Sequence, residues 1–310
     1  MEYIQGMVSV VIPTHNRAQL LARAVDSALA QTYQNIEIIV VSDGSEDDTE
    51  KVMKKTEAEH SKLHFISYFP GRGGNYARNT GIKAAKGEWV AFLDDDDEWH
   101  ADKIEKQINA AAEDSECGLI CTAINWVDDA TGKSTVFVPE AKKDSSRDIL
   151  LRNCIGSTTT VMAKHRLLDE CGMFDEDLKA RQDFDLWIRL CQITKVAVVK
   201  TPCVEYHNLA TNGQISWNYE KYSTAIEYMS RKYQSLREER LEPAEIKDLH
   251  SREQLGLARK AMKSGKNKIV RKLAIKSIRI KFNGKALIYY AASFFPIKTV
   301  ARVRNFLKIT

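Results

Sequence analysis

Four apolar segments alternate with amphipathic ones over the first 93 of the 310 residues. Residues 18–30 carry apolar side chains at intervals of three and four, which is typical of a helix between two strands. Apolar strands that alternate with helices predict an α/β fold, in which a mostly parallel sheet has helices on both faces. The expected strands are residues 8–12, 36–41, 63–69 and 89–93.

The rest of the chain has a less regular pattern. We expect strands within residues 118–138 and at residues 158–163 and 196–199. Residues 183–191 have the apolar spacing of a helix. From about Tyr219 onward the sequence becomes helical in pattern and increasingly basic.

Formal charge is spread unevenly along the chain. Residues 254–310 hold 15 of the 46 Lys and Arg residues and none of the 42 Asp and Glu residues, so they carry +15 and residues 1–253 carry −11. Between residues 268 and 308 the cations are interleaved with apolar side chains, which favours an anionic membrane surface as partner. The alternative is a helical extension that packs on the acidic part of the chain or on a partner chain. Because no recognised nucleic-acid motif accompanies the charge, we expect no nucleic-acid partner.

The cysteines and the N-terminus bear on the cellular compartment. The 6 cysteines form no C-x-x-C pair and no cluster at zinc-site spacing, so we expect reduced thiols. Residues 1–7 lack the features of a secretory signal, and no run reaches about 18 apolar residues. We therefore expect a cytoplasmic protein that reaches the inner face of the cytoplasmic membrane peripherally through its basic tail.

The run Asp94-Asp95-Asp96-Asp97 directly follows the fourth expected strand. Four adjacent carboxylates repel one another unless a cation lies near them, and in an extended segment Asp94 and Asp96 point to the same side. Carboxylate oxygens suit Mg²⁺ or Mn²⁺, and Mg²⁺ commonly takes only one or two of them and completes its shell with substrate phosphates. The run therefore predicts a site for a metal-bound diphosphate; the alternative is a solvated acidic loop.

Two further polar segments follow other expected strands. Residues 70–81 form a glycine-rich loop in which Arg72 and Arg78 can meet anionic oxygens, although an ordinary strand-to-helix turn can have the same composition. Asp43, at the end of the second strand, can accept hydrogen bonds from a nucleobase or a ribose, or else cap the next helix. Because ligands of open α/β sheets bind at the carboxyl ends of strands, we expect these segments and Thr14-His15-Asn16 to meet at one rim.

These motifs occur in a fixed order along the chain. They are the segments Val8 to Arg17, Ser42 to Ser45, Gly74 to Gly81, Phe92 to Asp97, Gly172 to Asp175 and Gln182 to Leu190. In order and spacing the set resembles family 2 glycosyltransferases with the GT-A fold, of the kind that builds bacterial polysaccharides. That resemblance implies a Rossmann-like nucleotide-binding sheet, followed here by a helical, basic C-terminal extension. The chain departs from the family where it has Ser42 and Gln182, since the family often has an acid at both positions.

The resemblance implies a role for each matching residue. The nucleotide sugar would be held by Pro13, Thr14, Asn16, Asp43, Gly74 and Arg78. Asp94 would reach the ribose with Asp95 assisting it, and Asp96 would bind Mn²⁺ or Mg²⁺ on the diphosphate. His207 would be a further ligand of the metal or the phosphates, although a lone histidine is often only a surface or core residue. Asp183 matches the catalytic aspartate that activates the acceptor hydroxyl, and by its position alone it could instead cap a helix.

The function implied is that of an inverting glycosyltransferase of the hexosyltransferase type. It would move a sugar from a nucleotide diphosphate sugar, with uridine as the expected base, to a saccharide or lipid-linked saccharide acceptor. Residues 1–110 would form the nucleotide-sugar-binding half and 111–218 the acceptor-binding half of one GT-A domain, before the extension at 219–310. The alternatives are a sugar-nucleotide pyrophosphorylase, whose usual glycine-rich entry loop is missing here, and a catalytically silent carbohydrate-binding protein of the same fold.

Overall fold

The structure is a computed structural model that describes residues 2–128, 132–208 and 218–295. The chain divides into two compact units. The first comprises Met1–Leu178 and Gln182–Ala210, and the second comprises Lys179–Arg181 and Thr211–Thr310. Among the described residues, the first unit contains a nine-stranded sheet with helices, and the second is helical.

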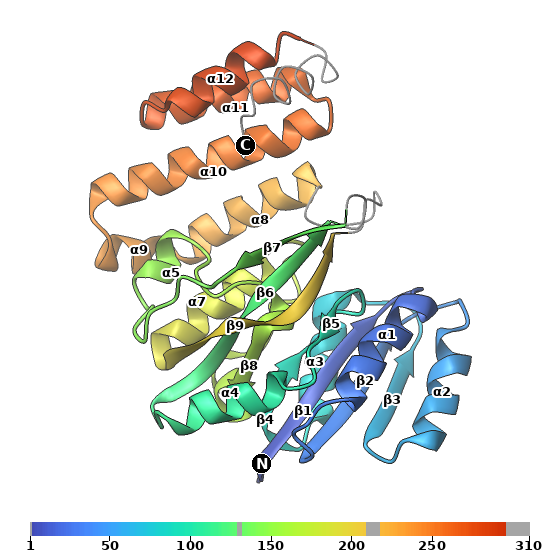
Figure 1. Cartoon of the computed structure of the whole chain (residues 1–310). Coiled ribbons are helices and arrows are strands. Elements are labelled where there is room, and N and C mark those ends of the chain that lie inside the picture. The colour runs from blue at the N-terminus through green and yellow to red at the C-terminus, as the bar shows by residue number, and fades with distance from the viewer. Residues whose placement is uncertain (1, 129–131, 209–217, 296–310) are drawn as a thin grey trace. The chain divides into compact units, whose positions relative to one another are not determined.

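Four parallel strands form the N-terminal half of the sheet (Figure 1). In the order in which they lie side by side they are β3 (Leu63–Tyr68), β2 (Ile36–Asp43), β1 (Ile4–Thr14) and β4 (Gly87–Phe92). Val10 of β1 lies in register with Ile38 of β2 and with Ala91 of β4. Strand β2 is buried along its whole length, which is the environment that a continuous apolar strand requires.

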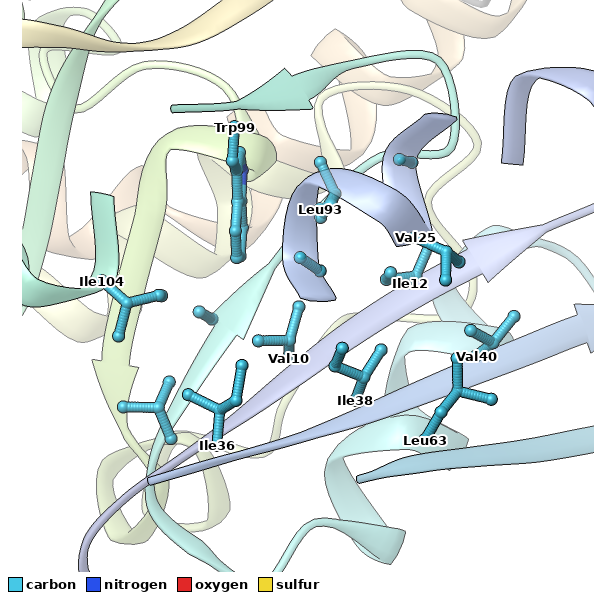
Figure 2. Packing of buried hydrophobic residues seen from close by; sticks show 14 of the residues in the cluster. Val10, Ile12, Val25, Ile36, Ile38, Val40, Leu63, Leu93, Trp99 and Ile104 are labelled. Atoms are coloured by element: carbon cyan, nitrogen blue, oxygen red, sulfur yellow. The ribbon is translucent and has the colours of Figure 1, made fainter. Parts of the chain in front are cut away.

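Helices cover both faces of these four strands. They are α1 (Ala18–Leu29), α2 (Thr49–Glu59) and α3 (Gly74–Ala84), whereas α4 (Lys103–Ala112) packs on strands of the second half of the sheet. Figure 2 shows Val10 and Ile12 of β1 packed with Val25 of α1 in one cluster. Alternate strand residues point to opposite faces, so Val11 faces the other side and meets α3. A Cβ atom at Gly81 of α3 would lie 2.4 Å from Val11 Cγ1, so glycine is what lets this helix approach the sheet.

The second half of the sheet is mixed. Beyond β4 it continues with β8 (Val161–Lys164), β6 (Cys117–Asp128), β9 (Lys195–Asn208) and β5 (Glu98–Trp99), and β7 (Lys133–Phe137) pairs with β6. The pairs β4–β8, β6–β8, β6–β7 and β5–β9 are antiparallel, and β6–β9 is parallel. The connecting helices include α5 (Asp148–Leu151), α6 (His165–Cys171) and α7 (Gln182–Ile193).

Two strands differ from the sequence expectation. The segment expected as a strand at 158–163 begins with a short 3-10 helix, Thr158–Thr160, and only then becomes β8. Strand β9 is much longer than the expected 196–199, because it pairs with both β6 and β5. Its Pro202 lies opposite Ala123 at an irregularity in the β6–β9 register, a place where proline is tolerated.

The helical unit contains α8 (Tyr219–Lys232), α9 (Gln234–Arg240), α10 (Pro243–Lys263), α11 (Asn267–Ile280) and α12 (Gly284–Ala292). Helix α10 begins with a capping box between Glu242 and Glu245, which satisfies two backbone donors of its first turn. Leu257 of α10 and Val270 of α11 belong to one apolar cluster. The predicted α/β class with a helical C-terminal extension is confirmed. Within the described ranges, no helix combines the length and the hydropathy needed to cross a bilayer.

Candidate functional site

The carboxyl ends of β1, β2 and β4 meet at one rim of the sheet. Thr14, the last residue of β1, lies in register with Ser42, the residue before Asp43. The backbone N–H of Leu93 donates to the carbonyl of Val11 at 3.1 Å, so the acidic run begins next to β1. Parallel strands that end together thus bring three distant polar segments of the sequence to one place.

Asp95 and Asp96 are held by side chains from the first strand and the loop after it. Thr14 Oγ1 donates to Asp95 Oδ2 at 2.7 Å. Arg17 Nη1 donates to Asp95 Oδ1 at 2.9 Å and to Asp96 Oδ2 at 3.1 Å. Arg17 therefore neutralises part of the charge of two neighbouring carboxylates.

Asp94 is paired with a different arginine. Arg78, on α3, donates from Nη2 to Asp94 Oδ1 at 2.6 Å, and its guanidinium lies 5.6 Å from the centre of the Phe174 ring. Gly74 is the first residue of α3, one turn before Arg78, and a Cβ atom there would lie 3.3 Å from Arg78 Nη1. Helix α3 thus places the nearly buried guanidinium of Arg78 next to the acidic run.

Ionisation is disfavoured in the buried part of the run. Burial, and then the neighbouring carboxylates of Asp94 and Asp95, raise the pKa of Asp96 to about 6 in spite of Arg17. Burial also raises the pKa of Asp97 well above its usual range, and Asp97 Oδ2 makes no hydrogen bond of normal geometry with a described residue. A hard divalent cation bound nearby would favour the ionised form of such crowded, buried carboxyl groups.

The potential metal ligands at the rim fit a cation whose coordination shell is completed by the enzyme's substrate. Within the part of the chain that the structure describes, no three His, Cys, Asp or Glu side chains converge closely enough to hold a metal. A dedicated protein cage for Zn²⁺ or Ca²⁺ would need more protein ligands than one or two carboxylates. Mg²⁺ and Mn²⁺ accept such a small set when phosphate oxygens complete the shell.

Asp43 holds the glycine-rich loop that leads into α3. Its Oδ1 accepts hydrogen bonds from the Tyr68 hydroxyl at 2.9 Å and from the backbone N–H of Arg72 at 2.6 Å. Its Oδ2 accepts from the backbone N–H of Gly73 at 2.7 Å. The N-cap residue of α2 is Asp48, so Asp43 does not cap that helix. The carboxylate instead fixes the loop beside the rim.

Asp43→Asn is expected to lower the free energy of unfolding by about 2 kcal/mol, because the amide NH₂ would face backbone donors in place of an acceptor. Urea denaturation measures the change. Asp48→Asn is the matched control, since Asp48 is exposed and its side chain makes no capping hydrogen bond. Equal stability of the two variants would show that the three hydrogen bonds to Asp43 do not hold the loop.

Two other residues that we expected to hold the nucleotide sugar, Pro13 and Asn16, lie at the same edge of the sheet. Pro13 is buried within β1, in register with Val41 of β2. Asn16 adopts a left-handed backbone conformation with a φ of +53°, and its Oδ1 accepts from the backbone N–H of Glu46 at 2.7 Å. Asparagine is one of the few residues that tolerate this conformation, so it can tie the loop after β1 to the loop after β2.

Asp183 is half-buried in the first turn of α7, which begins at Gln182. Both Asp183 and the acidic run affect the pKa of Tyr206, on β9. Burial raises the pKa of the Tyr206 phenol, and four carboxylates raise it further: Asp97, Asp94, Asp96 and Asp183. One tyrosine therefore lies within electrostatic range of both Asp183 and three members of the run. Sequence analysis missed Tyr206, because an aromatic residue in an apolar strand is unremarkable by pattern alone.

His207 lies beside the run through its backbone. Its N–H donates to Asp97 Oδ1 at 3.3 Å, and its Nε2 lies 3.1 Å from Glu98 Oε1. Glu98 also pairs with Arg23 Nε at 3.0 Å. The antiparallel pairing of β5 with β9 places Glu98 opposite Glu205 and so brings His207 to this edge.

Comparison with known proteins gives relatives for most of the sheet unit. A family described as "Glycosyl transferase family 2" matches residues 9–167. An uncharacterized glycosyltransferase of Rickettsia prowazekii is 35% identical over 196 residues, which cover 61% of this chain and 60% of that protein. This chain therefore spans less than two thirds of that relative.

Two further relatives have more specific names. The putative teichuronic acid biosynthesis glycosyltransferase TuaG of Bacillus subtilis is 29% identical over 230 residues, covering 74% of this chain and 89% of TuaG. The Escherichia coli protein WfgD, named as a UDP-Glc:alpha-D-GlcNAc-diphosphoundecaprenol beta-1,3-glucosyltransferase, is 28% identical over 193 residues, covering 62% and 73%.

Solved structures of similar fold cover more of the chain. The mannosyltransferase PcManGT from Pyrobaculum calidifontis, in complex with GDP-Man and Mn²⁺, has a TM-score of 0.60 at 17% identity and covers 98% of this chain and 88% of its own. S. aureus TarS in complex with UDP-GlcNAc has a TM-score of 0.58 at 16% identity, covering 92% and 90%. These likenesses confirm the predicted GT-A fold. Since the family match extends over just over half of the chain, the chain belongs to glycosyl transferase family 2.

Proposed function

We propose that the protein is an inverting glycosyltransferase that moves a sugar from a nucleotide diphosphate sugar, with uridine as the base, to a saccharide or lipid-linked saccharide acceptor. The observation that carries the proposal is the gathering of Asp94, Asp95 and Asp96 at the rim of the sheet, where Thr14, Arg17 and Arg78 hold their carboxyl groups. Family membership supports the reaction class. The name of WfgD, with its UDP-Glc donor and diphosphoundecaprenol-linked acceptor, and the TarS complex with UDP-GlcNAc support the choice of donor and acceptor.

The donor would lie along the rim. Pro13, Thr14 and Asn16 would border the nucleoside, and Asp43 would meet its base or ribose while it holds the glycine-rich loop in place. Asp94 would reach the ribose, with Arg78 as its counter-ion near the phosphates.

Asp96 would hold Mn²⁺ or Mg²⁺ together with the diphosphate, with His207 as a further ligand of the metal or the phosphates, while Asp95 would assist Asp94. When bound, this cation supplies Lewis-acid stabilisation of the charge that builds on the departing diphosphate. Arg17 already bridges Asp95 and Asp96, so it would favour their ionised forms and orient them before the substrate arrives.

Asp183 would act as the general base. It takes the proton of the acceptor hydroxyl while that oxygen bonds to the anomeric carbon, and the bond from that carbon to the diphosphate breaks on the opposite face. The configuration of the anomeric carbon is inverted, and the electron pair leaves on the nucleoside diphosphate. A single base suffices, because the departing diphosphate needs no proton when its charge is stabilised by a cation.

Product analysis distinguishes this function from its alternatives. We expect the protein, incubated with a UDP-sugar, Mn²⁺ and a diphosphate-linked lipid acceptor, to release UDP and to form a glycoside of inverted configuration; chromatography and NMR of the products measure this. A pyrophosphorylase would instead release inorganic diphosphate from UTP and a sugar phosphate. Absence of UDP release with every donor and acceptor would indicate a catalytically silent carbohydrate-binding protein.

A further inference from the structure

The C-terminal helices expose an unusual concentration of large apolar side chains. Across the described ranges, twelve such side chains are exposed, and six of them lie within residues 275–295. They are Ile275, Phe282, Leu287, Ile288, Phe294 and Phe295. In the first unit, which is larger, the other six comprise the run Val136 to Val138, at and just after β7, and the single residues Ile4, Phe69 and Ile193 on separate elements.

The exposed apolar residues of α12 share one face of the helix. Leu287, Ile288 and Ala291 are exposed, whereas Ala286 is buried on the other side. Phe294 and Phe295, 60% and 56% exposed, follow at the spacing of the next turn. In a water-facing helix this face would be polar, whereas α12 is apolar on its exposed side as well as on the side that packs against the apolar cluster.

Helix α11 presents a cationic face. Lys268, Lys272, Ile275, Lys276 and Arg279 are exposed and recur at intervals of three and four, so they lie along one side of the helix. None of these four cations forms an ion pair with a described residue. There is also no acidic residue after Glu253 in the sequence to compensate them.

The two faces border each other within the helical unit. Arg271, next to Lys272, donates from Nη1 to the carbonyl of Ser293 at 3.0 Å, and its guanidinium lies 4.8 Å from the centre of the Phe294 ring. Helices α11 and α12 run side by side in Figure 1. A hollow of about 540 Å³ opens between the start of α11 and the end of α12, and its lining includes Lys266, Lys268, Arg271 and Phe294.

We propose that the exposed sides of α11 and α12, here called the docking surface, bind an anionic lipid bilayer. Its apolar part is Phe282, Leu287, Ile288, Phe294 and Phe295, and its cationic part is Lys268, Lys272, Lys276 and Arg279. Aromatic and aliphatic side chains would enter the region between headgroups and acyl chains, while the cations meet lipid phosphates.

The mixture of side chains favours a bilayer over a protein partner. Lysine is depleted at protein interfaces, whereas juxtamembrane lysines attract anionic lipids. The docking surface lies wholly within the helical unit, and the inference does not rest on the proposed function. Residues 296–308, which belong to the same basic tail of the sequence, lie outside the described residues.

Vesicle sedimentation of the full chain tests the docking surface. We expect binding to vesicles of phosphatidylcholine with about one third phosphatidylglycerol, and little binding to phosphatidylcholine alone. Lys272→Gln/Lys276→Gln should weaken binding roughly 30-fold, and high salt should weaken it as well. Leu287→Ser/Ile288→Ser should weaken binding at least roughly 10-fold, with Phe294→Ser/Phe295→Ser as a second apolar variant.

The matched control is Val136→Ser/Ile193→Ser, which removes two exposed apolar side chains from the sheet unit. It should bind vesicles as the unaltered protein does. Thermal unfolding should be the same for all variants, because every altered side chain is exposed. The inference is overturned if the charge and apolar variants bind like the control. It is also overturned if light scattering shows a dimer that the Leu287→Ser/Ile288→Ser variant dissociates, since the apolar face would then meet a second copy of the chain.

Discussion

Asp183→Asn is expected to reduce the rate of sugar transfer by ~10²–10⁴-fold and to leave donor binding intact. Asparagine is nearly isosteric with aspartate but cannot take the proton of the acceptor hydroxyl. Steady-state kinetics with saturating donor and acceptor measures the loss in kcat. Retention of UDP binding separates loss of the base from loss of the site.

The control for this variant is Asp177→Asn, which alters an exposed acid near the same helix. Asp177 takes no part in the proposed reaction, so this variant should keep the activity of the unaltered protein. An active Asp183→Asn enzyme would remove Asp183 from the mechanism. The carboxylates near Tyr206 would then have a role other than general-base catalysis.

Asp96→Asn is expected to have two opposite effects: sugar transfer is lost, and the metal-free protein becomes more stable at pH 7.5. Burial and the neighbouring carboxylates raise the pKa of Asp96 to about 6 in the folded chain, above its usual value of 3.8. A raised carboxyl pKa favours the folded state while the group is protonated, and this advantage is lost as the pH rises through the interval between the two values. At pH 7.5 the ionised group therefore costs about 3 kcal/mol, which the neutral amide avoids.

Urea denaturation in the presence of a chelator measures this gain. It should shrink as the pH falls below 6, because Asp96 in the unaltered protein then becomes protonated. Asp48→Asn, at an exposed helix start, should show neither the gain nor the loss of transfer. An Asp96→Asn protein that is less stable than the unaltered one at pH 7.5 would mean that Arg17 alone already compensates the carboxylate.

Local sequence pattern was sufficient for the parallel half of the sheet. Strands β1, β2 and β4 are apolar runs that end at polar residues, and their burial follows from that composition. Strand β9 could not be predicted in full, because Lys200, Thr201 and Pro202 interrupt its apolar pattern. Its length depends on pairing with β6 and β5, which are distant in the sequence.

The site was predictable to the extent that it depends on where strands end. Ligands of open α/β sheets bind at the carboxyl ends of the strands, and this rule predicts that Thr14, Asp43 and the acidic run share one rim, even when no contact between them is known. The bridge from Arg17 to Asp95 and Asp96 depends on the tertiary path of the loop after β1. No sequence spacing indicates it.

The contacts that residues of β9 make at the site could likewise not be predicted from the sequence. The approach of Glu98 to His207 depends on the pairing of β5 with β9, and β5 is only two residues long. The proximity of Tyr206 to Asp183 depends on the packing of a strand near a helix. Pairings between such short or distant elements leave no periodic pattern in the sequence.

Calorimetric titration of UDP, with and without Mn²⁺, most directly tests whether the rim is a metal-assisted nucleotide site. The unaltered protein should bind UDP at least roughly 10-fold more tightly when Mn²⁺ is present, and Asp183→Asn should behave in the same way. Asp96→Asn should lose the effect of Mn²⁺. If Mn²⁺ leaves the UDP affinity of the unaltered protein unchanged, or if Asp96→Asn responds to Mn²⁺ as the unaltered protein does, the acidic run is not the metal site.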